Sequence, residues 1–396
     1  MKRRGAAAIL MLLIFSLALP AQVTWEPPKR LTWDNSDEIE PQIAAYWKFV
    51  HVCWTKKRSS GSGIYYKRST DYGETWSPRR VMSYYSTYSS PLAMAVQGPN
   101  VHIVYENLGE IMYRRSIDNG KTWELPQRMT WGGCYPYIVD IGISGAYVHI
   151  VFTSGGWVDF SDLFYKRSIN NGETWENTKR ITWNQGITDY LSLSVAGENV
   201  HVAYTEDSRY FEHWDLFYRK STDNGETWLT RSQIGERKND KEIVGYDDPD
   251  SLWYISTAAF NDNVYIFYLG EWEAGILSRI SRDNGETWDL KNPVVQPEYP
   301  DFLWFQTGHS PRSSTAFQNS AYLVCKLWYD AGYEDIFFLR STDQGRSWSS
   351  PERITWFQSL AAVPKISYTP DAGYLHMITA RENAAGWALI YKRGVQ

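Results

Sequence analysis

The chain contains 396 residues, of which 21% are charged and 16% are aromatic. This composition excludes a disordered chain, because disordered segments are poor in aromatic residues and rich in charge. The formal net charge of −5 gives no electrostatic basis for holding a polyanion, so we expect no nucleic-acid partner.

The N-terminal segment has the order of a secretory signal peptide. A cationic start at residues 2–4 precedes an apolar run over residues 6–19, and the small residue Ala21 follows. We expect residues 1–21 to be removed and the protein to be secreted, to an extracellular or periplasmic location. No other stretch approaches the ~18 apolar residues of a membrane span, so none is expected after cleavage. The alternative is that the segment is kept as an N-terminal anchor.

One octamer recurs six times and organises the rest of the chain. Its pattern is Ser-x-Asp-x-Gly-x-Thr-Trp with small variations, and the spacings between copies are 47, 52, 53, 60 and 60 residues. The Asp side chain can accept N–H groups of its own turn, Gly tolerates positive φ, and Trp can pack between sheets. We therefore predict a hairpin turn at each copy, with structural roles for Asp71, Asp118, Asn170, Asp223, Asp283 and Asp343.

Each octamer is flanked by segments that have the period of β-strands. An alternating run precedes it, as at residues 64–69, and an apolar strand with His or Tyr near its start comes before that, as at residues 50–54. A further strand precedes these two, and a fourth follows the octamer, often as Arg-x-Thr-Trp. Each repeat is therefore predicted to form a four-stranded sheet.

The two ends of the chain supply a seventh unit. Three strand-like segments follow Trp356, and residues 23–33 align with residues 121–131, which contain the end of an octamer and a fourth strand. We predict an all-β, seven-bladed β-propeller with four-stranded antiparallel blades. A single domain over residues 22–396 would be closed by pairing of the N-terminal strand with the C-terminal blade. The alternative is six blades and a flap.

Neither the cysteines nor the histidines indicate a metal site or a cofactor. Cys53 and Cys325 lie in apolar strand-like runs, so we expect core side chains and no disulfide. The recurring histidines occupy one repeat position, which favours a structural role in the second strand: His51, His102, His149, His201 and His376. No phosphate loop, nucleophile elbow or HExxH pattern occurs.

The six octamers resemble the Asp-box, or bacterial neuraminidase repeat, of the sialidase-like superfamily. The resemblance implies a propeller with the octamers on the face opposite the binding site. Sialidases of this kind carry an Arg-Ile-Pro motif, three arginines, a Tyr–Glu pair and an Asp acid/base. Here the first inner strand reads Glu-Pro-Gln-Ile-Ala-Ala after Ile39, without Arg. Sialidases are also six-bladed, so we do not transfer sialidase activity.

The loops opposite the octamers are the predicted ligand-binding face, and the long ones cluster in blades three to six. They combine carboxylates with aromatic residues, which suits sugars, because rings stack on C–H faces and paired carboxyl groups can hydrolyse glycosides. The candidate residues from these loops are Glu206, Trp214, Glu271 and Trp272.

Three arginines from different blades are further ligand-binding candidates: Arg209, Arg312 and Arg381. They would bind a carboxylate if they converged over the channel. The alternative is separate surface ion pairs, which exposed loop charges commonly form. Because acidic residues neighbour Arg209 and Arg381, we predict that the three guanidinium groups do not meet.

The sequence therefore favours a secreted, monomeric propeller that recognises a glycan or an extracellular protein, with catalysis left open. The alternative is a glycoside hydrolase, either of the exo-sialidase type or with a retaining or inverting carboxylate pair. Two close carboxylates in a concave pocket would favour the enzyme, and a flatter aromatic surface would favour the binding module.

Overall fold

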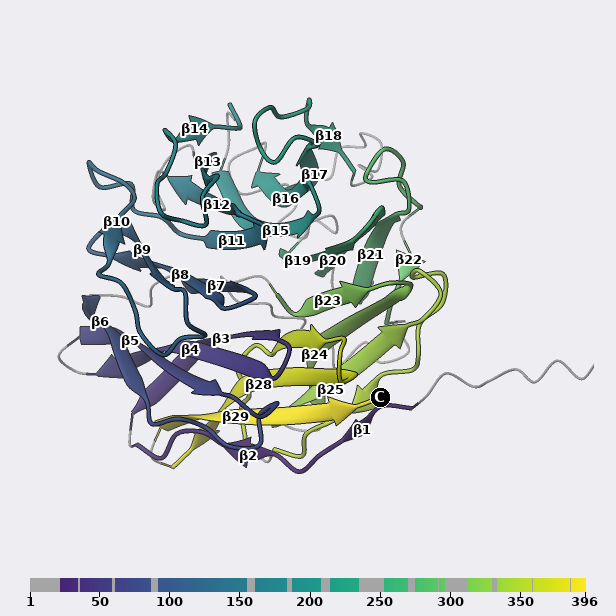
Figure 1. Cartoon of the computed structure of the whole chain (residues 1–396). Helices are drawn as coiled ribbons and strands as arrows, with labels where there is room; N and C mark the ends of the chain where they lie inside the picture. The colour runs from purple at the N-terminus through teal and green to yellow at the C-terminus, as the bar shows by residue number, and fades with distance from the viewer. Residues whose placement is uncertain are drawn as a thin grey trace, which may run out of the picture.

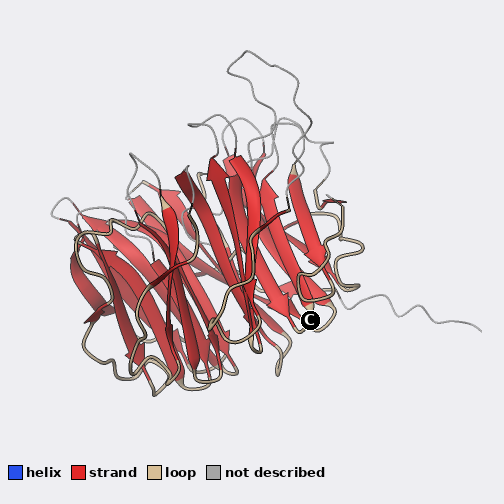
Figure 2. Cartoon of the chain, turned by 90° about the horizontal axis from the view of Figure 1, so that it is seen from above, coloured by secondary structure: helices blue, strands red, loops and turns tan. Residues whose placement is uncertain are grey.

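The computed structural model describes residues 22–34, 36–58, 61–86, 92–154, 161–183, 187–207, 214–234, 253–269, 275–290, 292–295, 312–329, 333–357, 359–384 and 386–396. Over these residues the regular structure consists of strands that run from one face of the molecule to the other (Figure 2). The described part of the chain contains no helix, and so none that is long and apolar enough to cross a membrane.

Seven antiparallel sheets form a ring of blades around a central channel (Figure 1). The predicted seven-bladed propeller is therefore confirmed. The innermost strands of blades 1 to 7 are β3 (Asp37–Tyr46), β7 (Leu92–Gln97), β11 (Val139–Ser144), β15 (Ile187–Ala196), β19 (Trp253–Phe260), β23 (Ser314–Phe317) and β27 (Lys365–Thr369). The second strands are β4 (Phe49–Arg58), β8 (Asn100–Asn107), β12 (Tyr147–Ser154), β16 (Asn199–Asp207), β20 (Asn263–Leu269), β24 (Ser320–Tyr329) and β28 (Tyr374–Asn383).

The two outer strands of each blade flank the octamer, since every third strand from blade 1 to blade 6 ends at the octamer's Ser. The third strands are β5 (Gly61–Ser69), β9 (Glu110–Ser116), β13 (Asp162–Ser168), β17 (Trp214–Ser221), β21 (Ile276–Ser281), β25 (Tyr333–Ser341) and β29 (Gly386–Val395). The outermost strands of blades 1 to 6 are β6 (Arg80–Ser86), β10 (Gln127–Arg128), β14 (Lys179–Arg180), β18 (Ser232–Gln233), β22 (Asn292–Pro293) and β26 (Glu352–Arg353).

Blade 7 is assembled from both ends of the chain, as predicted. The short strands β1 (Thr24–Trp25) and β2 (Lys29–Arg30) both pair with β29 and fill its outermost position. Thr24 lies opposite Val395, and Lys29 lies opposite Tyr391. Val23 and Leu31 are buried beside these strands. The ring therefore has no open seam between its first and last blades.

The octamer turns are held by hydrogen bonds of the side chains that recur in them. In blade 4, Asp223 accepts from Ser221 Oγ at 2.6 Å, from Thr227 N at 2.9 Å and from Thr227 Oγ1 at 2.6 Å. Asn170 repeats this arrangement in blade 3, where its Oδ1 accepts from Thr174 N at 2.9 Å and its Nδ2 donates to Thr174 Oγ1 at 2.8 Å. An amide can therefore replace the carboxylate, because the Thr hydroxyl changes from donor to acceptor.

Adjacent blades contact each other at these turns through aromatic packing and hydrogen bonds. Tyr165 of blade 3 packs edge-on against Trp228 of the next octamer with ring centroids 4.9 Å apart, and Arg167 Nη1 donates to Asn224 O at 3.0 Å. His149 Nδ1 lies 2.7 Å from the Tyr165 hydroxyl. The same His–Tyr pairing recurs, with separations of 2.6–2.7 Å, at His51–Tyr66, His102–Tyr113, His201–Tyr218 and His376–Tyr391.

The buried apolar side chains form clusters that bridge neighbouring blades. One cluster joins Val151 of blade 3 to Val202 of blade 4 and Ile266 of blade 5. Cys53 and Cys325 are buried in two other clusters, which agrees with the predicted core positions. Blade-to-blade packing therefore supplies the core, and the channel at the centre is free to present polar groups.

Candidate functional site at the mouth of the central channel

The innermost strands begin on the face opposite the octamer turns, which we call the long-loop face. The first residues of these strands, together with the residues just before them, surround the mouth of the channel. A cavity of about 220 Å³ lies in the channel and is lined by apolar residues such as Ala95 and Ala316, by Ser and Thr residues, and by Arg312.

The residues at one repeat position, in or just before each innermost strand, form a buried ring around the channel. In six of the seven blades this residue is polar. Its members are Gln42, Ala93, Asp140, Ser192, Ser256, Ser313 and Lys365. Several of them bond to the innermost strand of the next blade: Asp140 Oδ2 accepts from Leu193 N at 2.8 Å, and Ser192 Oγ accepts from Thr257 N at 2.9 Å. These bonds satisfy N–H groups on strand edges that have no neighbouring strand. The ring therefore has a structural role.

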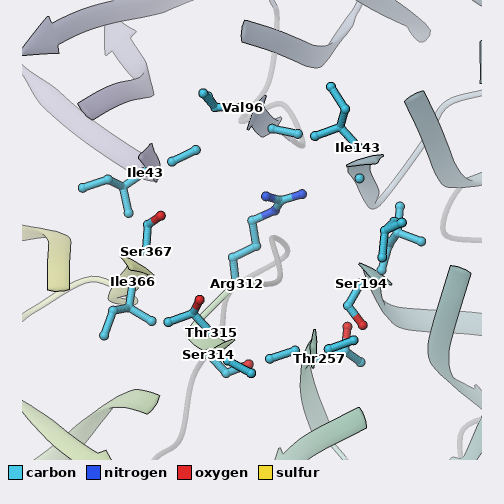
Figure 3. A pocket seen from close by; sticks show the side chains of 18 of the residues that line it. Ile43, Val96, Ile143, Ser194, Thr257, Arg312, Ser314, Thr315, Ile366 and Ser367 are labelled. Atoms are coloured by element: carbon cyan, nitrogen blue, oxygen red, sulfur yellow. The ribbon is translucent and has the colours of Figure 1, made fainter. Parts of the chain in front are cut away.

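Arg312 directly precedes the ring member Ser313, and its side chain reaches across the channel (Figure 3). It precedes β23 in blade 6, and its Nε donates to Asp140 Oδ1 in blade 3 at 3.1 Å. Its Nη2 donates to the carbonyl oxygen of Ile141 in the same strand. The guanidinium group is thereby fixed over the channel axis, while 22% of the side chain stays exposed. Its Nη1 makes no hydrogen bond to the described residues.

Two further charged groups, Glu40 and Lys365, belong to the same mouth. Burial lowers the pKa of Lys365 to about 7; the nearby Glu40 and Asp140 carboxylates oppose this shift, and Arg312 adds to it. Burial raises the pKa of Glu40 to about 7 against the attraction of Lys365 and Lys57. Burial also raises the pKa of Asp140, although the Arg312 guanidinium and two backbone N–H groups act in the opposite direction. Two groups of this cluster therefore titrate near neutral pH.

Residues with positive φ and unpaired buried polar atoms occur around these charges, as they also do at the octamer turns. Glu40, Tyr254 and Arg312 have φ values of 50°, 52° and 105°, all in the region that favours glycine. Glu40 Oε2 and both amide atoms of Gln42 are buried without a hydrogen-bond partner among the described residues. Strained conformations cluster at binding and catalytic sites, and buried unpaired polar groups are rare elsewhere. The mouth therefore has the character of a ligand site.

The other residues predicted from the sequence are distributed differently. Arg381 is exposed in the hairpin between β28 and β29 and stacks over Phe357 at 5.4 Å, instead of pairing with Glu382. Glu206 is buried in an ion pair with Arg231, and burial raises its pKa. Trp214 begins β17, and only its backbone is described. Outside the described residues lie Arg209, Glu271 and Trp272.

Sequence reasoning missed Glu40, Asp140 and Lys365 as parts of a site. Aligning the innermost strands by repeat would have placed Asp140 and Lys365 at one position, where a charged residue in an apolar strand is unusual. Within the described ranges, no group of three His, Cys, Asp or Glu side chains is arranged to hold a metal ion.

Comparison of the structure with solved proteins finds propellers of similar fold. The chain resembles an ulvan lyase of polysaccharide lyase family PL25 with a TM-score of 0.62 and 12% identity, covering 91% of this chain and 95% of the lyase. It resembles the phage phi92 endosialidase with a TM-score of 0.53 and 12% identity, covering 93% of this chain and 69% of that one. Its structural neighbours are carbohydrate-active propellers.

A third neighbour is much longer than this chain. The Trypanosoma rangeli sialidase matches with a TM-score of 0.47 and 12% identity, covering 90% of this chain and 55% of the sialidase, so the chain spans about half of that protein's length. No family model and no curated protein sequence matches the chain. At these identities the similarity establishes the fold alone.

Proposed function

We propose that the protein binds an acidic polysaccharide on its long-loop face, with a sugar carboxylate placed against Arg312. The proposal includes three predictions made from the sequence. These are that the protein belongs to the sialidase-like superfamily with its Asp-box repeats, that it is secreted, and that it is a monomer. The observation that carries it is the guanidinium group of Arg312, which is fixed over the channel axis by a partner in the opposite blade.

A guanidinium group has five N–H donors in a planar fork that matches a carboxylate. Arg312 donates through Nε to Asp140 and through Nη2 to Ile141, and its Nη1 makes no hydrogen bond to the described residues. A ligand carboxylate can therefore bind the guanidinium without displacing Asp140. Because Asp140 holds the fork in place beforehand, little side-chain entropy is lost when the ligand binds.

Lys365 would add a second attraction for an anion. It lies close enough to interact electrostatically with Arg312 and Asp140, and a ligand carboxylate nearby would raise its pKa from about 7. Binding of an acidic sugar would then take up a proton near neutral pH. A neutral sugar would cause no such uptake, which distinguishes the two ligand classes.

The neighbouring propellers act on the same chemical class of ligand. A structure of the PL25 ulvan lyase with a TM-score of 0.60 is bound to -[GlcA(1-4)Rha3S]-, a chain of glucuronic acid and sulfated rhamnose units. The endosialidase is named for a substrate that also carries carboxylates. Both parallels support an acidic glycan for this chain over an extracellular protein.

Catalysis on the same glycan is the second candidate function. It is favoured by Glu40, whose buried carboxylate has an unpaired oxygen and a pKa of about 7, close to the value suited to a general base. With the uronate carboxylate neutralised by Arg312, such a base could remove the proton from the carbon that bears the carboxylate, while the glycosidic C–O bond at the adjacent carbon breaks and the leaving oxygen takes up a proton. This chemistry is elimination, whereas the hydrolase predicted as the alternative needs two working carboxyl groups.

The test of binding uses the purified full chain and a panel of ulvan, alginate, polygalacturonate, hyaluronan and neutral dextran. We expect binding to at least one acidic polymer and none to dextran. Arg312→Gln should weaken binding of short acidic oligosaccharides about 10- to 100-fold, as expected for a lost charge-assisted hydrogen bond. The matched control is Arg346→Gln on the octamer face, where Arg346 is exposed.

The double variant Arg312→Gln/Asp140→Asn protects this test from a folding defect, because it removes the unpaired buried charge that Arg312→Gln leaves. It should melt closer to the parent chain and bind the short acidic oligosaccharides as weakly as Arg312→Gln does. Parent-like binding of these oligosaccharides by the double variant, or binding of no acidic polymer by the parent, would refute the proposal. Release of unsaturated uronate, abolished by Glu40→Gln, would establish elimination. New reducing ends without unsaturated uronate, abolished by the same change, would establish hydrolysis.

A further inference from the structure

Four tryptophans at one repeat position are exposed on the outer rim of the propeller. They end the Arg-x-Thr-Trp segments of the outermost strands in blades 7, 2, 3 and 6, on the side nearest the long-loop face. Their exposed fractions are 66% for Trp33, 70% for Trp131, 67% for Trp183 and 66% for Trp356. Single exposed apolar residues are common on protein surfaces, but exposure of the same residue at one repeat position in four blades is a feature that chance exposure does not explain.

Each indole is positioned by a fixed set of polar contacts, which we call the rim cassette. In blade 2, Arg128 donates through Nε to Thr130 O at 2.8 Å and through Nη2 to Glu110 Oε1 at 2.6 Å. Thr130 Oγ1 donates to Glu110 Oε2 at 2.6 Å and accepts from Ile111 N at 2.9 Å. The guanidinium group then lies over the Trp131 ring, 5.9 Å from its centroid.

The rim cassette is repeated in two other blades with the same connections. In blade 3 it joins Arg180, Thr182 and Asp162, and Arg180 lies 5.9 Å from the Trp183 ring. In blade 6 it joins Arg353, Thr355 and Asp335, and Arg353 lies 5.8 Å from the Trp356 ring.

Blade 7 reaches a similar arrangement with different residues. Ala388 stands where the other cassettes have a carboxylate, and Thr32 Oγ1 still accepts from Leu389 N at 3.0 Å. The cation over Trp33 is Lys67 from the neighbouring blade, at 5.6 Å. An exposed indole beside a cation is therefore what all four blades share.

The fold does not require these tryptophans. Blades 1, 4 and 5 build the same outermost strand pairing, with Tyr65 opposite Val81, Phe217 opposite Gln233 and Leu277 opposite Pro293. The sequence has Tyr84, Glu236 and Gln296 at the aligned Trp position in these blades. Since an indole that is two-thirds exposed buries little apolar surface, its contribution to stability is small.

We propose that Trp33, Trp131, Trp183 and Trp356 are stacking platforms for the sugar rings of an acidic polysaccharide, separate from the channel mouth. This inference rests on the proposed function for the class of ligand. One indole per blade suits a polymer that presents the same unit repeatedly, whereas a protein partner would favour one contiguous apolar patch. The cation beside each indole attracts a sugar carboxylate while the ring contacts the C–H face. The guanidinium groups of Arg128 and Arg180 are accessible, with 46% and 42% of their side chains exposed.

The test compares long and short ligands on the full chain. Replacing all four tryptophans by Ala should weaken binding of the acidic polymer selected by the panel at least about 15-fold, since each stack is worth about two- to tenfold and the effects multiply along one chain. Binding of an acidic oligosaccharide short enough for the channel mouth should change less than about twofold. The same four positions changed to Tyr should retain most polymer binding.

The matched control is Trp47→Ala, which removes a 57% exposed indole from the turn between β3 and β4 on the octamer face and should leave polymer binding unchanged. Parent-like polymer binding by the quadruple Ala variant would overturn the rim platforms and leave the proposed function intact. Loss of oligosaccharide binding on Arg312→Gln, with the polymer still held by the rim, would support two separate sites. Self-association of the parent chain that the quadruple variant abolishes, without loss of polymer binding, would assign the rim to a second copy and also overturn the inference.

Discussion

The hydroxyl group of Tyr165 occupies the space that a side chain at Gly225 would need. A Cβ atom added to Gly225 would lie 1.7 Å from the Tyr165 oxygen, and Gly225 has a φ of 78°. The two residues belong to blades 3 and 4, so a turn in one blade is shaped to receive a side chain of the blade before it. The same contact recurs at Gly73, Gly120, Gly172 and Gly285 with Tyr391, Tyr66, Tyr113 and Tyr218.

Gly225→Ala is expected to lower the free energy of unfolding by about 2–5 kcal/mol, because both the left-handed backbone and the clash carry a cost. Urea unfolding measures this loss. The double variant Gly225→Ala/Tyr165→Phe should recover part of it, since the phenol oxygen causes the clash. A Gly225→Ala protein with the stability of the parent would show that the blades are not locked at this contact.

Asp223→Ala is expected to cost about 1–3 kcal/mol, because the turn donors from Ser221 and Thr227 lose their acceptor. Asp223→Asn should cost less than about 1 kcal/mol, since Asn170 already serves in blade 3. Chemical denaturation compares the two variants. Equal losses in both would mean that the negative charge, and not the hydrogen-bond geometry, stabilises the octamer turn. Ligand affinity should stay unchanged in both variants while they are folded.

Acidification is expected to destabilise the protein through its buried histidines. Burial lowers the pKa of all five from the usual 6.5 to about 3. The unfolded chain therefore binds protons between pH 6.5 and pH 3 that the folded protein does not bind. Stability present above pH 6.5 is lost as the pH falls, by up to about 1.4 kcal/mol per pH unit for each histidine.

Denaturation series at several pH values measure this slope. His149→Asn, which keeps a polar atom near the Tyr165 hydroxyl, should lower stability at pH 7.5 and make the slope between pH 6.5 and pH 5 shallower. An unchanged slope would mean that His149 is protonated in the folded protein. A substitution of the exposed residue Glu173 serves as a control, because Glu173 is not part of a His–Tyr pair.

Removal of residues 22–33 is expected to expose the edge of β29 and to uncover the contacts made by Val23 and Leu31, whose burial is worth about 3–6 kcal/mol together. An exposed edge strand also promotes aggregation. Calorimetry and light scattering on the shortened chain test this, with a chain lacking only residues 1–21 as the control. A melting transition equal to that of the control would contradict the role of β1 and β2 in closing the ring.

The octamer made the fold predictable because its residues act locally. Asp223 bonds within four residues of its own position, so sequence spacing alone indicates the turn. Residues 23–33 were recognisable as a displaced fourth strand because they repeat a segment with a known place in blade 2. The histidines were recognisable as structural because they share one repeat position, although nothing in the sequence identified the tyrosine that each one meets.

The channel mouth was not predictable because its contacts join distant segments. Arg312 and Asp140 are 172 residues apart in the chain and meet only after the ring has closed. The acidic neighbours considered for the arginines were those nearby in sequence, and the structure gives Arg312 a partner from the opposite blade. The exposure of Trp131 was also missed, since the Arg-x-Thr-Trp pattern indicates a strand but does not say how far its last side chain is from the core.

The closure of blade 7 has a consequence for biosynthesis. Strands β1 and β2 are made before blades 1 to 6, and their partner β29 is made after them. The early segment must therefore remain without its native neighbour while blades 1 to 6 emerge from the ribosome. A chain that stalls before residue 386 therefore carries an open ring, in which β1 and β2 have no strand to pair with.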